Sequence, residues 1–124
     1  MIRALVIDDS RAMRAILTKQ LAGFGFDVAQ AFDGRDALDL IDTGYRPDIA
    51  LVDWNMPRMD GLSFIKAVRA RDELRDVSLM MVTTESEHGN IVRALAAGAH
   101  EYVIKPFTEE VIADKLALLG LVGV

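Results

Sequence analysis

The sequence predicts an α/β domain in which five strands and five helices alternate, (βα)5, folded as a doubly wound parallel sheet of order 2-1-3-4-5. Three observations predict this class. Short apolar runs alternate five times with segments of helical periodicity along the 124 residues. The runs are apolar on both faces, as in strands that helices cover on each side. Two of the runs are followed by aspartates, and in a sheet of this class the ligand crevice lies at the carboxyl ends of the strands.

The elements follow in order along the chain. Strands are expected at Arg3–Ile7, Val28–Ala31, Ile49–Val52, Leu79–Val82 and Tyr102–Ile104. Apolar residues at helical spacing mark the first, third, fourth and fifth helices: Met13, Ile16, Leu17 and Leu21; Leu62, Ile65 and Val68; Ile91, Leu95 and Ala99; Ile112, Leu116 and Leu119. The second helix, roughly Gly34 to Thr43, has the weakest pattern.

Residues that favour helix ends support the same division. N-caps are expected at Ser10, Asp33, Asp60, Ser86 and Thr108. Glycines that suit helix C-termini are Gly23, Gly44 and Gly98. Two of the three prolines, Pro57 and Pro106, fall in predicted strand-to-helix loops, so the breaks between elements agree with the apolar pattern.

The composition excludes several classes of protein. Hydrophobic residues make up 52% of the chain, there is no cysteine, and the net charge is −5 without any block of Lys or Arg. These values disfavour disulfide scaffolds, nucleic-acid binding and anionic-membrane binding. The apolar stretch Leu116 to Val124 is too short to span a bilayer, and the first strand leaves no room for a signal peptide. We expect one cytoplasmic domain over residues 1–124, without membrane insertion or an output domain.

Carboxylates gather at two predicted strand ends. Asp8 and Asp9 follow the first strand, and Asp53 follows the third. In the order 2-1-3-4-5 these strands are neighbours at the topological switch point, so the three acids converge on one crevice. Clustered carboxylates repel each other and attract a hard cation, which makes Mg²⁺ the predicted ligand. The alternative is that Asp8 and Asp9 only supply negative charge at the start of the first helix.

Two further strand ends carry polar groups. Thr83-Thr84-Glu85 closes the fourth strand, and Lys105-Pro106 closes the fifth. A lysine ammonium and a hydroxyl suit a phosphoryl oxygen or a carboxylate. Each is ordinary when taken alone, since a lysine at such a position is usually solvated.

Taken together, these positions resemble the receiver domain of bacterial response regulators, a flavodoxin-like fold, over Ile2 to about Gly120. The carrying residues are Asp8-Asp9, Asp53, Thr83 and Lys105-Pro106-Phe107. The stretch from Asp53 to Gly61, DWNMPRMDG, is similar to the CheY-like single-domain chemotaxis regulators, as are Ala97-Gly98-Ala99 and Tyr102 to Phe107.

The resemblance implies a phosphoryl-transfer site. Asp53 would be the phosphoacceptor. Asp9 and Asp53 would bind Mg²⁺ through carboxylate oxygens, Asn55 through its backbone carbonyl, and Asp8 mainly through a metal-bound water. Lys105 would pair with Asp53 before transfer and with a phosphoryl oxygen afterwards. The Lys105-Pro106 bond is a candidate cis peptide.

The resemblance also implies a switch. Thr83 would move toward the phosphoryl group, and the Tyr102 ring would turn into the vacated space. The simpler interpretation is a half-buried edge aromatic with its hydroxyl in water, and both can hold because the inactive state would look like this. Asn55 and Glu85 would tune loss of the phosphoryl group, with a lifetime of seconds to minutes. The partner face would comprise the fourth helix, fifth strand and fifth helix, with candidate contacts at His88, Asn90, Tyr102, Val111 and Lys115.

The expected partners are a sensor histidine kinase or its phosphotransfer domain, and a downstream target such as the flagellar motor switch or another kinase. The protein would be a monomeric switch that catalyses its own phosphorylation and dephosphorylation rather than an enzyme. Alternatives are a phosphorelay shuttle or phosphate sink outside chemotaxis, and a degenerate receiver that acts as a scaffold. An alternative of another class is a Mg²⁺-dependent aspartyl-phosphate phosphatase, although Asn55 stands where such enzymes place a second acid.

Two residues near Asp53 complete the expectations. Arg58 adds a positive charge for which the sequence suggests no partner, and Trp54 is expected at the rim of the acidic pocket.

Overall fold

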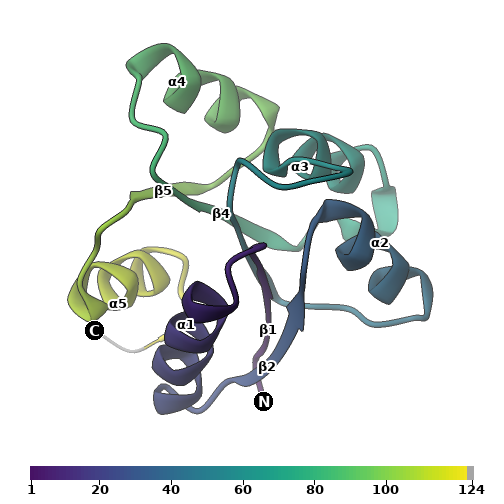
Figure 1. The fold of residues 1–124 in the computed structure, drawn as a ribbon. Helices are drawn as coiled ribbons and strands as arrows, with labels where there is room; N and C mark the ends of the chain where they lie inside the picture. The colour runs from purple at the N-terminus through teal and green to yellow at the C-terminus, as the bar shows by residue number, and fades with distance from the viewer. Residues whose placement is uncertain (123–124) are drawn as a thin grey trace.

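The computed structural model describes residues 1–122, and these form a three-layer α/β sandwich (Figure 1). The central sheet is parallel and has five strands: β1 (Arg3–Ile7), β2 (Asp27–Ala31), β3 (Ile49–Val52), β4 (Ser78–Thr83) and β5 (Glu101–Ile104). Its strand order is β2-β1-β3-β4-β5. The predicted fold class and strand order are therefore confirmed, with strand bounds that differ by one residue at some ends.

Helices cover both faces of the sheet. They are α1 (Arg11–Gly23), α2 (Gly34–Asp42), α3 (Gly61–Arg69), α4 (His88–Ala97) and α5 (Glu109–Leu118), and a short 3₁₀ turn, η1 (Asp72–Leu74), was not predicted. The core on one face takes its helical side chains from α1 and α5. The core on the other face takes them from α2, α3 and α4. The same separation of the helices is visible in Figure 1.

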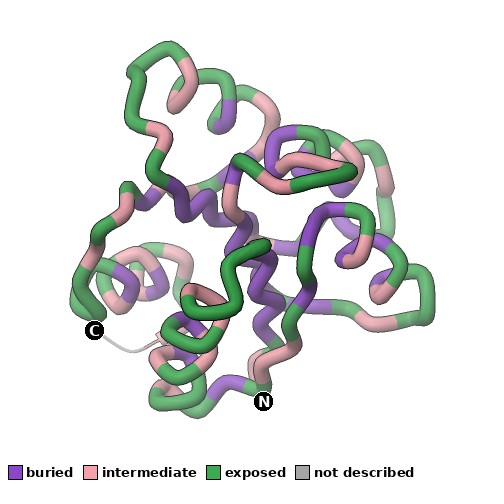
Figure 2. Tube along the Cα trace, in the orientation of Figure 1, coloured by how far each residue is buried: buried purple, intermediate pink, exposed green. Residues whose placement is uncertain are grey.

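The strands divide their side chains between the two cores. In β1, Leu5 and Ile7 pack on the α2–α3–α4 side, whereas Ala4 and Val6 pack on the α1–α5 side. This alternation follows from the two-residue period of a strand. Because β1 and β3 lie at the centre of the sheet, all their residues except Arg3 are buried (Figure 2). The ends of β1 and β3 are therefore held firmly, and so are the positions of the residues that directly follow them, Asp8 and Asp53.

Most of the predicted helix ends are observed. The side chains of Ser10, Asp33, Asp60 and Thr108 accept the capping N–H bonds. The prediction at Ser86 was wrong, since α4 is capped by Glu87 without a side-chain bond. The predicted cap at Gly23 is displaced by one residue: α1 ends at Gly23, its C-cap is Phe24, and Gly25 adopts the positive φ. A positive φ does occur at Gly44 and Gly98, where α2 and α4 end.

No helix within residues 1–122 is long and apolar enough to cross a membrane. The apolar stretch that begins at Leu116 is described as far as Val122, and Gly123 and Val124 lie outside the described residues. Leu116, Leu121 and Val122 pack against the α1–α5 core, so this stretch is partly a core segment.

Candidate functional site

Three aspartates converge at the carboxyl ends of β1 and β3. Ile7 and Val52 are paired across these strands, so Asp8 and Asp53 leave the sheet side by side. The Asp53 N–H donates to the Ile7 carbonyl at 2.9 Å, which extends the pairing by one residue. One carboxylate oxygen from each of Asp8, Asp9 and Asp53 lies within 4.8 Å of the others. The cluster forms because strand register, rather than sequence proximity, brings Asp53 to the Asp8-Asp9 pair.

The three carboxylates differ in exposure and in partners. The side chain of Asp8 is 2% exposed and that of Asp53 is 12% exposed, whereas Asp9 is exposed. One oxygen of Asp8 accepts the Ser10 N–H at 2.8 Å, and one oxygen of Asp53 accepts the Trp54 N–H at 2.8 Å. Backbone bonds thus fix the orientation of two carboxylates and leave oxygens of the cluster available to a ligand.

Lys105 brings the positive charge to this cluster. Lys105 directly follows β5, its backbone N–H donates to the carbonyl of Thr83, the last residue of β4, at 2.8 Å, and the Lys105-Pro106 peptide bond is cis. The ammonium nitrogen lies 2.8 Å from Asp8 and 3.5 Å from Asp53. Pairing with Asp53 was expected, but the closer contact is with Asp8. The more buried carboxylate therefore has the closer counter-ion.

Burial raises the pKa of Asp53 above its ordinary value, and burial is the largest influence. The Lys105 ammonium, the Thr83 hydroxyl and the Trp54 N–H all lower this pKa, and the Asp8 carboxylate raises it. The net upward shift means that the negative charge on Asp53 is less stable in the folded protein than in water. A cation bound beside Asp53 would offset the cost of its buried negative charge.

The donor set fits a hard divalent cation. All the ligand atoms are oxygens, and three carboxylates face a single ammonium. Mg²⁺ prefers such oxygens and commonly takes one or two carboxylates while it keeps several waters. Within the described part of the chain, this is the one group of three acidic or histidine side chains close enough to share an ion. Asn55, two residues after Asp53, has an exposed side chain, and its backbone carbonyl as a ligand stays a prediction.

Thr83, Glu85 and Tyr102 form a short contact chain beside the cluster. Thr83 is fully buried at the end of β4, and its hydroxyl accepts the Glu85 N–H at 3.3 Å. The Tyr102 hydroxyl donates to the Glu85 carbonyl at 2.7 Å. The alternative of a hydroxyl in water is therefore wrong for Tyr102. Burial, then the charges of Glu85 and Asp53, raise the pKa of Tyr102 to about 12, so this hydroxyl keeps its proton as a donor.

The predicted partner face is exposed in part. His88 is exposed, Asn90 is half-buried, and Val111 is 37% exposed. The Lys115 ammonium pairs with Glu101 at 2.9 Å, so it is less available than expected. The prediction missed exposed apolar residues on α4 and β5, namely Val92, Leu95 and Ile104. The periodicity assigned Leu95 to the apolar face of the fourth helix and Ile104 to a strand covered on both faces, and both are exposed.

Trp54 and Arg58 also differ from the sequence-based expectation. Trp54 was expected at the rim of the acidic pocket; its N–H does bond to Asp53, but the residue is only 8% exposed and belongs to the core on the α2–α3–α4 side. The guanidinium of Arg93 lies 5.8 Å from the centre of its ring. Arg58 has a partner after all: it forms two hydrogen bonds with the carboxylate of Asp33.

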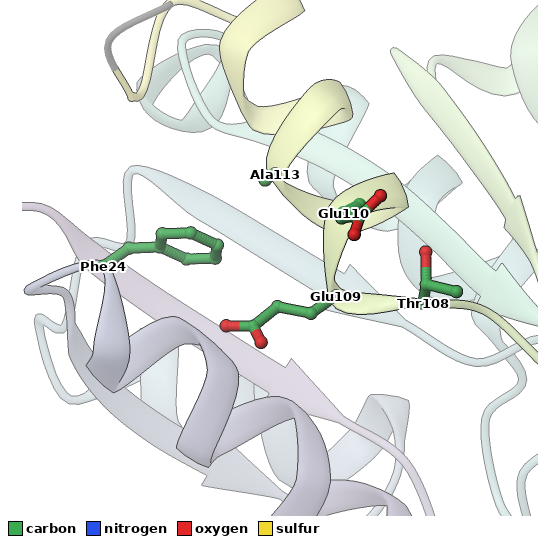
Figure 3. A pocket seen from close by; sticks show the side chains of 5 residues that line it. All are labelled: Phe24, Thr108, Glu109, Glu110 and Ala113. Carbon is green, nitrogen blue, oxygen red and sulfur yellow. The ribbon is translucent and has the colours of Figure 1, made fainter.

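A separate cavity of about 310 Å³ lies between α1 and α5 (Figure 3). It is lined by Phe24, Thr108, Glu109, Glu110 and Ala113, none of which belongs to the acidic cluster. In Figure 3 the Glu109 carboxylate points toward the Phe24 ring. The acidic residues predicted to carry the chemistry therefore lie outside this cavity, at the carboxyl ends of the strands.

Known proteins that are similar to this chain show its family. A family model described as "Response regulator receiver domain" matches residues 4–117. The chain belongs to this family. It is 37% identical over 118 residues to the chemotaxis protein CheY1 of Helicobacter pylori, which covers 94% of this chain and 95% of that protein. It is 41% identical over 115 residues to a CheY homologue of Campylobacter jejuni, covering 92% and 88%.

Solved structures give the same assignment. The chemotaxis protein CheY4 of Vibrio cholerae superposes with a TM-score of 0.88 at 34% identity, covering 95% of this chain and 98% of that one. A CheY-like receiver domain protein of Methanospirillum hungatei gives a TM-score of 0.86 at 25% identity. The chain is thus a CheY-like response regulator receiver domain, and proteins of this kind are signalling switches.

Proposed function

We propose that this receiver domain is a phosphorylation-controlled switch of the chemotaxis type. It would take a phosphoryl group on Asp53 from a sensor histidine kinase or its phosphotransfer domain, in the cytoplasm and as a monomer. Its output would be a changed contact with a protein such as the flagellar motor switch or another kinase. The observation that carries the proposal is the convergence of Asp8, Asp9 and Asp53 with Lys105 at one end of the sheet.

In this proposal Asp53 is the nucleophile. One of its carboxylate oxygens forms a bond to phosphorus as the bond between phosphorus and the donor histidine nitrogen breaks. The Trp54 N–H fixes one oxygen of Asp53 at 2.8 Å, which leaves the other, on the Lys105 side, to attack. Lys105 then donates hydrogen bonds to a phosphoryl oxygen, for which its 3.5 Å distance from Asp53 leaves room.

Asp8, Asp9, Asp53 and the Asn55 backbone carbonyl would hold Mg²⁺. When bound, Mg²⁺ neutralises charge on the transferring phosphoryl group and on the carboxylates around it. The more buried Asp8, which already pairs with Lys105 at 2.8 Å, would act mainly through a metal-bound water. The exposed Asp9 and the half-buried Asp53 would bind directly.

The proposed switch passes through Glu85. Thr83 and Tyr102 both contact the backbone of Glu85, the first at its N–H and the second at its carbonyl. If the Thr83 hydroxyl turned toward a phosphoryl oxygen, it would give up its bond to the Glu85 N–H, and the segment that holds Tyr102 would lose one anchor. Phosphorylation would thereby bias a two-state equilibrium at β5 and α4. The Asn55 and Glu85 side chains would tune loss of the phosphoryl group.

A pull-down with and without beryllofluoride and Mg²⁺ tests this function, with Asp53→Asn as the control. We expect a partner that binds wild-type protein only when both reagents are present. A motor component among the captured proteins would favour the chemotaxis function, and a phosphotransfer protein would favour the shuttle alternative. Failure of a labelled phosphodonor to modify Asp53 in the presence of Mg²⁺ would refute the proposal.

A further inference from the structure

Arg58 has an unusual backbone conformation in the loop that follows Asp53. Its φ is 62°, and it is the one non-glycine residue with a positive φ within the described residues. The Met59 N–H donates to the Pro57 carbonyl at 2.6 Å, which closes a three-residue γ-turn around Arg58. A residue with a side chain holds this conformation only where the surroundings enforce it.

The Arg58 side chain supplies an enforcing contact. Its Nε donates to one oxygen of Asp33 at 2.7 Å, and its Nη2 donates to the other at 3.1 Å. The Asp33 side chain is 0% exposed, although that of Arg58 is 59% exposed. The same carboxylate accepts the Asp36 N–H at 2.8 Å and so caps α2. A planar two-bond pair to a buried, immobile carboxylate holds Arg58 more firmly than an ordinary surface ion pair would.

Gly34 brings the two loops together at a second point. Its N–H donates to the Met59 carbonyl at 3.1 Å. A Cβ at residue 34 would lie 2.9 Å from that carbonyl oxygen and 2.7 Å from the Met59 Cγ, so the close approach requires glycine. The β2–α2 loop and the β3–α3 loop are therefore joined by an ion pair, a backbone bond and a close contact.

The ends of the β3–α3 loop are fixed independently. The Asp53 N–H is bonded to β1, and the Gly61 N–H donates to the Trp54 carbonyl at 2.8 Å. Between these anchors the loop contains Asn55, whose carbonyl is a proposed metal ligand. The middle of the loop is held to the rest of the molecule at Arg58 and Met59.

We propose that Arg58 is a positioning residue for the metal site: by pairing with Asp33, it holds the β3–α3 loop in the conformation from which the Asn55 carbonyl would bind the ion. The proposal rests on the proposed function, since it concerns the same Mg²⁺ site. Arg58 does not contact the ion. It acts through the backbone, and its loss would let the loop relax out of a conformation that a side chain disfavours.

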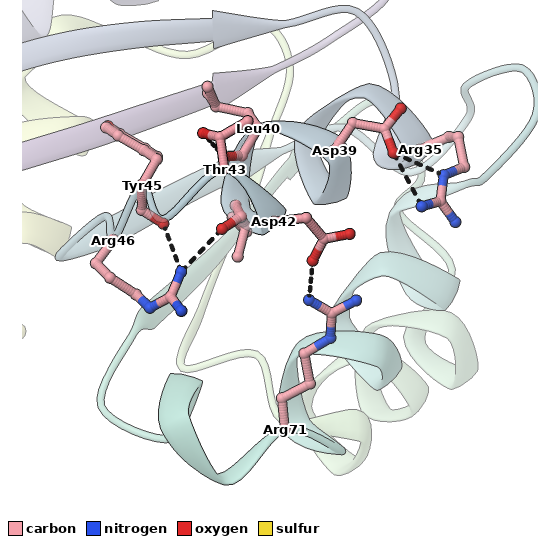
Figure 4. A network of polar contacts seen from close by, with 9 residues as sticks. Arg35, Asp39, Leu40, Asp42, Thr43, Tyr45, Arg46 and Arg71 are labelled. Carbon is pink, nitrogen blue, oxygen red and sulfur yellow. Dashed lines mark hydrogen bonds and ion pairs between the residues drawn. The ribbon is translucent and has the colours of Figure 1, made fainter.

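The test is direct titration of the folded protein with Mn²⁺, which prefers the same oxygen ligands, followed by competition with Mg²⁺. Binding is read from the loss of the free-ion electron paramagnetic resonance signal, which requires no phosphoryl transfer. The variants are Arg58→Ala, Arg58→Gln and Arg58→Lys. The matched control is Arg35→Ala, because Arg35 pairs with the exposed Asp39 on α2 at 2.9 Å (Figure 4).

We expect Arg58→Ala and Arg58→Gln to weaken binding of both ions by about tenfold, as loss of a supporting residue around a metal site commonly does. Arg58→Lys restores part of the affinity, and Arg35→Ala binds like wild type. If Arg58→Ala does not fold, Arg58→Gln carries the same expectation.

Two results would overturn the inference, and they are distinguishable. Wild-type protein that binds neither ion would refute the proposed metal site itself. Wild-type protein that binds, together with folded Arg58 variants of equal affinity, would refute the positioning role alone. A lower urea midpoint with unchanged affinity is the signature of a merely structural residue and would count as the second result.

Discussion

Replacement of Asp53 by asparagine is expected to stabilise the metal-free protein. Oxygens of the three clustered aspartates lie within 4.8 Å, and two unit charges at that distance repel by about 3.5 kcal/mol at an effective dielectric constant of about 20. Lys105, 3.5 Å from Asp53, attracts it by about 5 kcal/mol on the same scale. Solvent weakens the repulsion from the exposed Asp9, so Lys105 offsets most of the repulsion, and the burial of Asp53, which is the largest influence on its pKa, leaves a net penalty on its charge. We therefore expect a gain of about 1 kcal/mol in the free energy of unfolding.

Asparagine suits the test because it keeps the oxygen that accepts the Trp54 N–H. The assay is urea unfolding at neutral pH in EDTA, with Asp76→Asn, at an exposed site, as the control. Mg²⁺ at ten times its Kd adds about 1.4 kcal/mol to the wild type and less to the variant, so the difference shrinks or reverses. A wild type as stable as Asp53→Asn in EDTA would refute the electrostatic reasoning.

The same comparison has a defined pH dependence. The folded-state pKa of Asp53 is raised, so folding favours its protonated form. Below the unfolded-state pKa the group is neutral in both states and carries no penalty. As the pH rises from that value through the raised pKa, the wild type loses stability relative to Asp53→Asn. The gap between the two proteins thus opens on raising the pH and closes in acid, and a gap that is constant with pH would contradict this assignment.

Three further predictions concern neighbouring residues. Lys105→Met leaves a buried carboxylate without its counter-ion and costs about 3 kcal/mol in urea unfolding, whereas Lys115→Met, at a more exposed pair, costs less than about 1 kcal/mol. Gly61→Ala costs about 3 kcal/mol or more, because its Cβ would lie 2.2 Å from a backbone carbonyl oxygen. Gly89→Ala, with nothing within 4 Å, causes no loss; equal effects at the two glycines would disprove the steric argument. Emission from Trp54, the single tryptophan, changes on addition of Mg²⁺ or beryllofluoride; a spectrum that neither reagent alters would exclude coupling to the site.

The fold could be predicted because its signals are local and repeated. Runs such as Ala4–Ile7 and Ile49–Val52 are apolar at every position. Such a short run is typical of a strand that helices cover on both faces, because every one of its side chains is then buried. The acidic cluster followed from the same reasoning. Once β1 and β3 are neighbours, a residue directly after each strand has almost no freedom in position. Asp8 and Asp53 were therefore predictable together, although they are 45 positions apart in the sequence.

Side-chain pairing inside the site was less predictable. Lys105 can reach both Asp8 and Asp53, each of which accepts one backbone N–H, and the closer contact depends on how deeply each carboxylate is buried and how it is oriented. The sequence alone shows neither the burial nor the orientation of a side chain. The burial of Trp54 was missed for a related reason. Its neighbours in the sequence are polar loop residues, whereas the residues that cover it come from other elements of the fold.

The Arg58–Asp33 pair shows a further limit. Aspartate at residue 33 has a complete local explanation as the cap of α2, so the sequence contains no sign of a second partner. Arginine at residue 58 lacks a local explanation, because its left-handed conformation would favour glycine. Arg58 is explained by a contact with a distant part of the fold, the Asp33 carboxylate, and not by its own backbone conformation. In this protein, that contact joins two loops that the sheet alone leaves separate, and the metal affinity of the Arg58 variants decides whether the junction serves the site or only the fold.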